Sequence, residues 1–297
     1  MTLHIASTIE EALEAISAGA RPIAGGTDLV VGARQGKTPL PDMLVAIDRI
    51  DELAAIDVGQ TETRIGAGVT HATLMTHDVV VGGFTAISDA AALVGSPATR
   101  NVGTLGGNVM NGSPAMDTGA PLIVLGAEAE LATASATRRV SMADLWTGPG
   151  QTSAEPSELC TALTLPNRPE NSGSAYVRLE YRRAMEIAVV GAAASVVLEG
   201  DEIASIRVAL TAVAPTIIEV DELDSLAGHK PGDALAAVAA AASEQSTPIS
   251  DLRAADDYRR HTIGVMARRA VDAAARRAAG EHIAVPVNRA LGIGAAS

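Results

Sequence analysis

Two glycine-rich segments carry the residues whose types and spacing fit a defined chemistry. The first is Ala24-Gly25-Gly26-Thr27-Asp28, and the second is Thr99–Pro121, which is predicted to form turns rather than a plain helix or strand. Glycine adopts positive φ and lets another group approach the main chain closely. Successive exposed N–H groups form a concave anion site, for which phosphate is a common ligand. The two segments and the downstream Asp117 therefore predict a bound dinucleotide, although either glycine pair alone is also typical of an ordinary turn.

Within the second segment, residues 104–108 are predicted to be a tight turn whose N–H groups are free to face a ligand. Other nucleotide motifs are absent, since the sequence has neither G-x-G-x-x-G at the first strand–helix junction nor a P-loop. No H-E-x-x-H or G-x-S-x-G motif is present. We therefore expect surface or core roles for His71 and His77, and neither a catalytic nor a metal-ligating residue in this chain.

The densest basic and aromatic cluster consists of Arg178, Tyr181, Arg182 and Arg183. Taken alone, it is typical of a solvated strand edge, which charged side chains often protect. The alternative is that this loop presents charge and an aromatic ring to an anionic cofactor.

The composition limits the possible partners. The chain has 297 residues, 47% of them hydrophobic but only 2% aromatic, and a formal net charge of −13. Acidic charge and few aromatic side chains argue against a nucleic-acid partner. The single cysteine, Cys160, cannot by itself ligate an iron–sulfur cluster. Neither a secretory signal nor an apolar stretch of ~20 residues is visible, so we expect a cytoplasmic protein without an integral membrane segment.

Residues 1–55 are predicted to form a small α/β unit. A capping box at Thr8 indicates a helix start. A strand over Arg21–Ala24 is expected to run into the first glycine turn, followed by a short helix over Thr27–Gln35 with Leu29 and Val30 facing inward. This order places main-chain N–H groups and the positive end of a helix at a phosphate.

Residues 56–170 are predicted to form a second, α+β unit. It begins with a hairpin pattern of Leu53–Ile56 and Thr63–Ala67. Asp117 or Thr118 is expected to cap a helix. Further elements are predicted over Phe84–Val94, Pro121–Leu125, Glu128–Thr133 and Leu159–Leu165.

Residues 175–283 follow a polar linker at Asn167–Ser174. Gly200-Asp201 is expected to join two strands in a hairpin. Ser250–Ala279 is a predicted helix with an apolar stripe that contains Ile263, Met266 and Val271. Residues 284–297 lack periodicity and are predicted to be a tail.

Three stretches of the chain resemble the medium, flavin-binding subunits of molybdenum hydroxylases. They are AGGTDL at Ala24–Leu29, RNVGTLGGNVMNGSPAMD at Arg100–Asp117 and DLRAADDYRRH at Asp251–His261. The family includes carbon monoxide dehydrogenase, xanthine dehydrogenase, nicotine and nicotinate dehydrogenases and 4-hydroxybenzoyl-CoA reductase. The resemblance covers about residues 3–283 in the family's order, and the paired glycine motifs are far more specific than either motif alone.

This resemblance implies a mixed α+β chain. Its fold would be the PCMH or vanillyl-alcohol-oxidase type of FAD-binding fold in two subdomains, residues 1–55 and 56–170. A C-terminal domain like that of the CO dehydrogenase flavoprotein, with a small antiparallel sheet and helices, would occupy residues 175–283. The implied cofactor of this chain is FAD.

The resemblance also implies which residues contact the FAD. The first pyrophosphate loop would comprise Ile23, Ala24, Gly25, Gly26, Thr27, Asp28 and Leu29, and the second Thr104, Leu105, Gly106, Gly107 and Asn108. Asp117 matches an acidic residue that contacts FAD, and Cys160 falls where the family usually has an aliphatic residue near the cofactor. Arg178 falls where many members have a lysine near the flavin ring, which puts the tuning of the flavin in question because a guanidinium is not equivalent to an ammonium. Tyr181 is expected to approach the isoalloxazine.

The implied function is electron transfer in a heterotrimeric molybdenum hydroxylase. Electrons would pass from the molybdenum cofactor of a large molybdopterin-binding subunit through the [2Fe–2S] clusters of a small subunit to this FAD, and then to an external acceptor. The expected assembly is a dimer of heterotrimers. Two alternatives are a stand-alone FAD-dependent oxidoreductase of the same fold and an assembly subunit that has lost its cofactor, which the intact glycine motifs disfavour. The organic substrate and the acceptor are not encoded in any motif of this chain.

Overall fold

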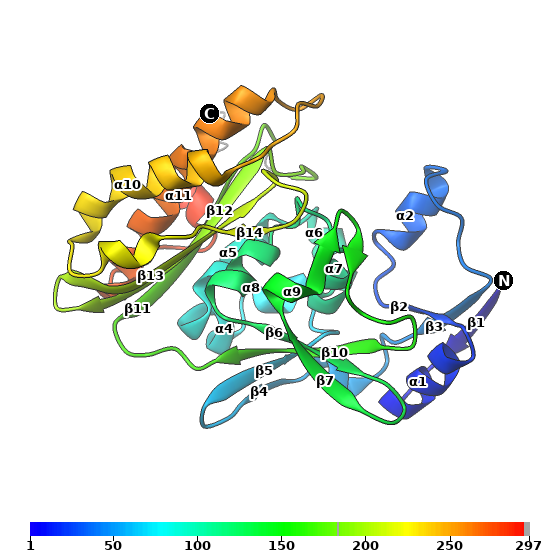
Figure 1. Cartoon of the computed structure of the whole chain (residues 1–297). Helices are drawn as coiled ribbons and strands as arrows, with labels where there is room; N and C mark the ends of the chain where they lie inside the picture. Colours follow the sequence, from blue (N-terminus) through cyan, green and yellow to red (C-terminus); the bar gives the residue numbers. More distant parts are fainter. Residues whose placement is uncertain (183, 294–297) are drawn as a thin grey trace.

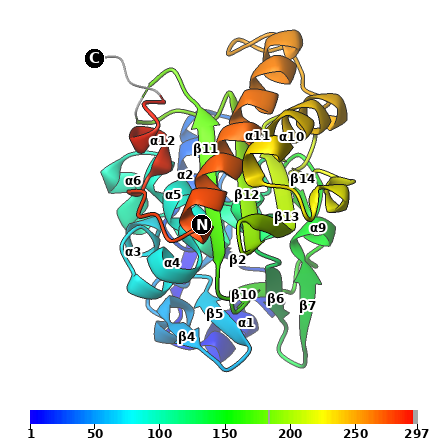
Figure 2. The same cartoon turned by 90° about the vertical axis from the view of Figure 1, so that its left-hand side faces the viewer.

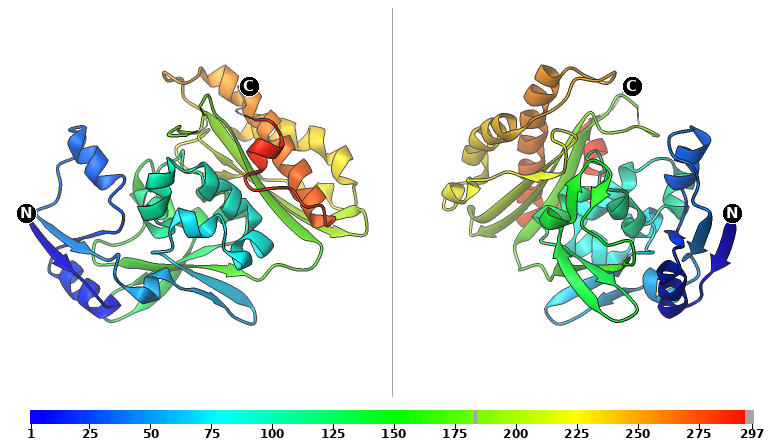
Figure 3. Two further views of the ribbon diagram at one scale, coloured as in Figure 1. Left: turned by 180° about the vertical axis from the view of Figure 1, so that it is seen from behind. Right: turned by 45° about the vertical axis from the view of Figure 1, so that its right-hand side comes forward.

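The computed structural model describes residues 1–182 and 184–293. Three units lie in a row, with the N-terminal unit at one end, an α+β unit in the middle and a second sheet covered by long helices at the other end (Figures 1 and 3). Arg183 of the basic cluster and residues 294–297 of the expected tail lie outside the described residues.

The N-terminal unit is a parallel sheet with one helix packed on it. Its strands are, in order across the sheet, β1 (Thr2–Ile5), β3 (Met43–Ala46) and β2 (Arg21–Ile23). Helix α1 (Ile9–Ser17) begins as predicted, because the Thr8 hydroxyl accepts a hydrogen bond from the Glu11 N–H at 3.2 Å. The helix buries Ala12, Leu13 and Ile16 in the core of this unit.

Helix α2 (Leu29–Arg34) follows the first glycine turn as predicted, but its packing differs from the prediction. None of its six residues is buried, so the expectation that Leu29 and Val30 face inward is wrong. The helix stands apart from the sheet from which it emerges (Figures 1 and 3). With no element over it, a helix of this length has nothing against which to bury an apolar face.

The middle unit is built on a five-stranded antiparallel sheet. In order, the strands are β4 (Ile56–Val58), β5 (Glu62–Gly66), β10 (Leu159–Pro166), β6 (Glu128–Ala132) and β7 (Thr137–Ser141). The helices are α3 (His71–Leu74), α4 (Asp78–Gly83), α5 (Thr85–Leu93), α6 (Pro97–Val102), α7 (Leu105–Asn111), α8 (Gly119–Val124) and α9 (Met142–Leu145). A small hairpin of β8 (Trp146–Gly148) and β9 (Gln151–Thr152) completes the unit. Ile65, Leu131 and Leu163 face the helices and form part of the main core.

Two sequence predictions for this region are wrong. The first hairpin arm is β4, because residues 51–54 form the 3₁₀ helix η1 (Asp51–Ala54), which buries Leu53. The glycine segment Thr99–Pro121 holds most of α6, all of α7 and the start of α8 rather than turns alone. The Ser96 hydroxyl accepts from the Thr99 N–H at 3.2 Å and so caps α6, which offsets the low helix propensity of a polar, glycine-rich stretch.

The C-terminal unit is an antiparallel sheet between two cores. Its strands are β11 (Ser172–Leu179), β12 (Val190–Glu199), β13 (Glu202–Thr211) and β14 (Ile218–Glu219), in this order. One face packs on α10 (Pro231–Gln245) and α11 (Asp256–Ala278), with η2 (Leu223–Leu226) at its edge (Figure 2). Tyr176, Ala193 and Ala209 on the other face join the main core of the middle unit. The hairpin at Gly200 and the buried stripe of Ile263, Met266 and Val271 are confirmed.

The described part of the segment predicted to be a tail, residues 284–293, contains helix α12 (Val287–Ala290). The side chains of Val287 and Asn288 are fully buried. Hydrophobic periodicity could not predict this helix, because single residues of the segment make its contacts with distant strands and helices. Among the described residues, no helix has the length and apolar character needed to span a membrane.

Candidate dinucleotide site

The first glycine loop combines free donors with a close main-chain contact. The N–H groups of residues 25–28 form no hydrogen bond with the described part of the chain. Gly26 adopts φ +66°, a conformation that favours glycine. A Cβ built on Gly25 would lie 1.9 Å from the carbonyl oxygen of Val102, so only glycine fits there. The loop therefore offers adjacent N–H donors while it is pressed against the start of the second segment.

The second glycine segment uses its N–H groups within the protein, so the prediction of free donors at residues 104–108 is wrong. The N–H groups of Leu105 and Gly106 donate to the carbonyls of Val69 and Ala67 at 2.9 and 2.8 Å. The Gly107 N–H donates to the Thr104 hydroxyl at 3.1 Å, which caps α7. These bonds form because α7 begins directly against the chain that leaves β5, a long-range contact that local glycine content does not predict.

The glycines of the pair at 106 and 107 have different surroundings. A Cβ on Gly106 would lie 2.5 Å from the Cβ of Ala67, so this glycine permits the packing of α7 on the middle unit. Gly107 is exposed, and a Cβ there would meet only the Thr104 hydroxyl, at 3.0 Å. Of these two glycines, Gly107 is therefore the one at which a ligand can approach the start of α7.

His71 is a buried residue that the sequence predictions did not place in the site. Its N–H donates to the Gly103 carbonyl at 3.0 Å, and the residue is 2% exposed. A Cβ on Gly103 would lie 3.4 Å from Cδ2 of His71 and 3.6 Å from Oγ1 of Thr27, so these three residues meet where the two glycine segments join. His71 Nδ1 is buried without a hydrogen-bond partner among the described residues. Burial, followed by the charge of Arg100, lowers the pKa of His71 to about 4, which leaves the ring neutral at physiological pH.

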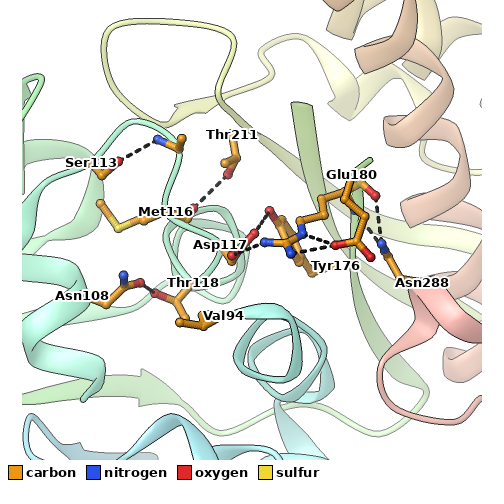
Figure 4. A network of polar contacts seen from close by, with 12 residues as sticks. Val94, Asn108, Ser113, Met116, Asp117, Thr118, Tyr176, Glu180, Thr211 and Asn288 are labelled. Atoms are coloured by element: carbon orange, nitrogen blue, oxygen red, sulfur yellow. Dashed lines mark hydrogen bonds and ion pairs between the residues drawn. The ribbon is translucent and has the colours of Figure 1, made fainter. Parts of the chain in front are cut away.

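Thr118, one of the two predicted caps, occupies the N-cap position of α8 but makes no side-chain cap hydrogen bond. Asp117, the other predicted cap, does not cap the helix. Its two carboxylate oxygens accept from the Tyr176 hydroxyl at 2.8 Å and from Arg178 Nη1 at 2.7 Å (Figure 4). Helix α8 starts after Thr118, whose hydroxyl instead donates to Asn108 Oδ1 at 2.6 Å. That bond joins the segment that carries Asp117 and Thr118 to helix α7.

Arg178 lies in the interior rather than on a solvated strand edge, so the first interpretation of the basic cluster is wrong for this residue. It is fully buried and forms ion pairs of 2.7 Å with both Asp117 and Glu180 (Figure 4). Burial alone would lower the pKa of the guanidinium, but the neighbouring Asp117, Tyr176 and Glu180 hold it above its ordinary value. Burial and the carboxylate of Asp117 likewise hold the pKa of Tyr176 well above its ordinary value, so its hydroxyl stays a donor.

Two further predicted residues lie in other surroundings. Cys160 sits in the main core, 5% exposed, where burial raises the pKa of its thiol to about 12. Tyr181 is 58% exposed, and its hydroxyl donates to the carbonyl of Arg253 at 2.8 Å. The structure thus brings together the two glycine segments, and separately Asp117 with Arg178. Cys160 packs in the same core cluster as Leu105 and Val109 of the second segment, whereas Tyr181 is bonded to Arg253.

A cavity of about 330 Å³ lies elsewhere, between the middle and C-terminal sheets. Its lining includes Glu62, Glu128, Thr164, Arg207 and Glu219, and none of the predicted site residues. In the described part of the chain, no three His, Cys, Asp or Glu side chains gather as metal ligands would.

Comparison with known proteins finds two family domains in this chain. Residues 1–168 match the family described as the FAD binding domain in molybdopterin dehydrogenase, and residues 175–274 match the CO dehydrogenase flavoprotein C-terminal domain. The two matches together define a flavoprotein subunit of a molybdenum-dependent oxidoreductase, and they confirm the mixed α+β fold class.

Individual relatives lead to the same family. The carbon monoxide dehydrogenase medium chain of Afipia carboxidovorans is 35% identical over 263 residues, covering 87% of this chain and 90% of the relative. The xanthine dehydrogenase FAD-binding subunit of Escherichia coli O157:H7 is 29% identical over 284 residues, or 94% and 97% of the two chains. A solved carbon monoxide dehydrogenase from Hydrogenophaga pseudoflava superposes with a TM-score of 0.88 at 29% identity, over 93% of this chain and 98% of that one. The chain belongs to the FAD-binding medium subunits of the xanthine dehydrogenase and carbon monoxide dehydrogenase family.

Proposed function

We propose that this chain binds FAD and carries electrons from the [2Fe–2S] clusters of a partner subunit to an external acceptor. The observation that carries the proposal is the loop of residues 24–28, whose four adjacent N–H groups have no partner in the described structure. Such a row of donors fits the pyrophosphate of a dinucleotide. The family matches narrow the dinucleotide to FAD.

The residues present fit this cofactor. Ile23 through Leu29 would hold the pyrophosphate through main-chain donors, and Gly107 and Asn108 would approach it from α7. The buried, neutral ring of His71 packs where the two segments meet, with its Cδ2 toward Gly103. In the second segment, Thr104, Leu105 and Gly106 would act by holding α7 in place, because their polar groups are already bonded within the protein.

The Asp117–Arg178 pair would border the flavin end of the site. A buried guanidinium that two carboxylates hold in place is a fixed charge, which tunes a nearby redox group without moving. Cys160 and Tyr181 are assigned to the surroundings of the cofactor on the family resemblance alone. FAD supplies the redox chemistry once it is bound, and this chain's residues bind and orient it.

The partners in this proposal are a molybdopterin-binding large subunit and a [2Fe–2S] small subunit, assembled as a dimer of heterotrimers in the cytoplasm. The relatives support the subunit role, since they include medium chains of carbon monoxide dehydrogenase. One cysteine in 297 residues agrees with clusters held on another chain. The organic substrate would then meet the large subunit and not this chain.

The proposal is tested by purifying the full chain and titrating it with FAD while recording the visible absorption of bound flavin. A stoichiometric complex is expected. Protein that is folded by circular dichroism but takes up no FAD would refute the proposal. A stand-alone oxidoreductase is the alternative, and turnover of an organic substrate by the purified single chain would favour it over the subunit role.

A further inference from the structure

Strand β11 lies at the edge of the C-terminal sheet, and the main chain of Arg178 is on the outer side of that edge. Val189 N–H on the β12 side donates to the Leu179 carbonyl at 3.0 Å, which indicates that Leu179 faces the neighbouring strand. Because main-chain groups alternate along a strand, those of Ser174, Tyr176 and Arg178 face away from β12. An edge strand with unpaired main-chain groups needs other partners.

Side chains from three helices supply those partners. Arg277 of α11 donates to the Ser174 carbonyl at 2.8 Å, and Asp89 of α5 accepts from the Tyr176 N–H at 3.2 Å. The side-chain amide of Asn288 makes both bonds at Arg178, accepting from its N–H at 3.0 Å and donating to its carbonyl at 2.8 Å. The amide of Asn288 therefore takes the place of a neighbouring strand at this one residue.

The segment that carries Asn288, residues 284–293, is anchored at a second point. We call it the C-terminal strap. The N–H of Val287 donates to Asp89 at 2.8 Å, and Asp89 is held in turn by an ion pair with Arg277 at 2.6 Å. Asn288 itself is fully buried, and the strap lies beyond residue 274, where the matched C-terminal domain ends.

The C-terminal strap contacts Arg178, the residue that forms the buried ion pair with Asp117. Arg178 reaches Asp117 with its side chain and Asn288 with its main chain. Figure 4 shows Asp117, Tyr176, Glu180 and Asn288 gathered around this contact. Tyr176 and Arg178 lie two residues apart on one face of β11 and bind the two oxygens of the same carboxylate. A displacement of the β11 main chain at Arg178 would therefore move one donor of Asp117 relative to the other.

We propose that Asn288 is a positioning residue of the flavin site, and that the C-terminal strap holds Arg178 where its guanidinium pairs with Asp117. This inference rests on the proposed binding of FAD. It assigns a role to a segment outside both matched domains. Asn288 touches no reacting atom in this proposal and acts only through Arg178.

The test compares wild type, Asn288→Ala, Asn288→Asp and Asn167→Ala in the full chain. Asn167 is the matched control because its side chain also bridges separate segments, accepting from Thr63 and donating to the Gly59 carbonyl at 2.9 Å each, and it makes no contact with Arg178. Three quantities are measured in each protein, namely the Kd for FAD, the visible spectrum of the bound flavin and the free energy of unfolding without FAD.

Asn288→Ala is expected to raise the Kd about tenfold and to shift the bound-flavin spectrum, because two bonds at Arg178 are lost. Asn288→Asp keeps the acceptor for the Arg178 N–H but loses the donor to its carbonyl, so its Kd should lie between those of wild type and the alanine variant, and its spectrum should still be shifted. Asn167→Ala should match wild type in Kd and spectrum even where it lowers stability. These differences separate positioning from a general loss of stability.

Wild-type Kd and spectrum in Asn288→Ala would overturn the inference, as would an equal loss of affinity in Asn167→Ala. If Asn288→Ala does not fold, Asn288→Asp decides, and wild-type values for both quantities would again overturn it. Failure of the wild-type protein to bind FAD would refute the proposed function instead, so the two failures are distinguishable.

Discussion

Gly25 and Val102 are in direct main-chain contact, so the two glycine-rich segments form one structure. A Cβ on Gly25 would lie 1.9 Å from the Val102 carbonyl oxygen and 2.4 Å from its carbonyl carbon. Neither partner is a flexible side chain, so the contact allows no local adjustment. The loop with free N–H groups is therefore held in place by the segment whose own N–H groups are bonded.

Gly25→Ala is expected to push these segments apart. The added methyl overlaps the main chain of Val102 and Gly103, which should destabilise the protein by about 1–3 kcal/mol and raise the Kd for FAD at least about tenfold. Gly32→Ala in α2 is the control, because an added Cβ meets no atom within 4 Å and alanine favours a helix by about 0.5–1 kcal/mol. Urea unfolding and FAD titration measure both effects, and equal FAD affinity in the two variants would contradict the prediction.

The neighbouring glycines of α7 should respond differently to substitution. Gly106→Ala places a methyl 2.5 Å from Ala67 Cβ and should cost about 1–3 kcal/mol of stability, with or without FAD. Gly107→Val adds bulk at an exposed position, so most of the fold should be retained while FAD binding is lost. Circular dichroism, urea unfolding and flavin absorbance distinguish the two. Unchanged flavin content in Gly107→Val would remove Gly107 from the site.

Replacing Arg178 should be costly because it leaves the buried carboxylates of Asp117 and Glu180 without their cation. Arg178→Met is expected to lower the free energy of unfolding by about 3–5 kcal/mol. Arg178→Lys should cost less, although one ammonium cannot reproduce the planar contacts with both Asp117 and Glu180. The control is Arg138→Met, which breaks a partly exposed pair with Glu158 and should lower the free energy of unfolding much less, because solvent screens this pair. Similar losses for the buried and exposed arginines would contradict the role assigned to this network.

His71 should make stability depend on pH between its native and unfolded pKa values. The native pKa is lowered to about 4 from an ordinary 6.5, so the unfolded chain binds the proton first as pH falls. Stability is therefore lost on acidification across this window, by about 2 kcal/mol from pH 7 to pH 5 for this one group. His71→Gln, which does not titrate, should lose about that much less over the same range in urea unfolding. An identical pH dependence in both proteins would show that His71 is not held neutral by burial.

The sequence by itself determined the parts of this protein that depend on local patterns. The cap at Thr8, the hairpin at Gly200 and the buried stripe of α11 follow from spacing within one element. The positions of the two glycine segments were also predictable, because glycine is required wherever a backbone conformation or a close approach excludes a side chain.

Tertiary structure decided which donors remain free and which charges meet. Asp117 pairs with Arg178 across 61 residues, and Arg178 is held by Asn288 across 110. The N–H groups of Leu105 and Gly106 are taken by carbonyls that follow β5, whereas those of residues 25–28 have no partner among the residues that the structure describes. A local pattern shows that a polar group exists. Only the packing of distant segments determines whether that group is bonded within the protein or left for a ligand. The reason is that each buried donor or acceptor must find its partner wherever the fold places one.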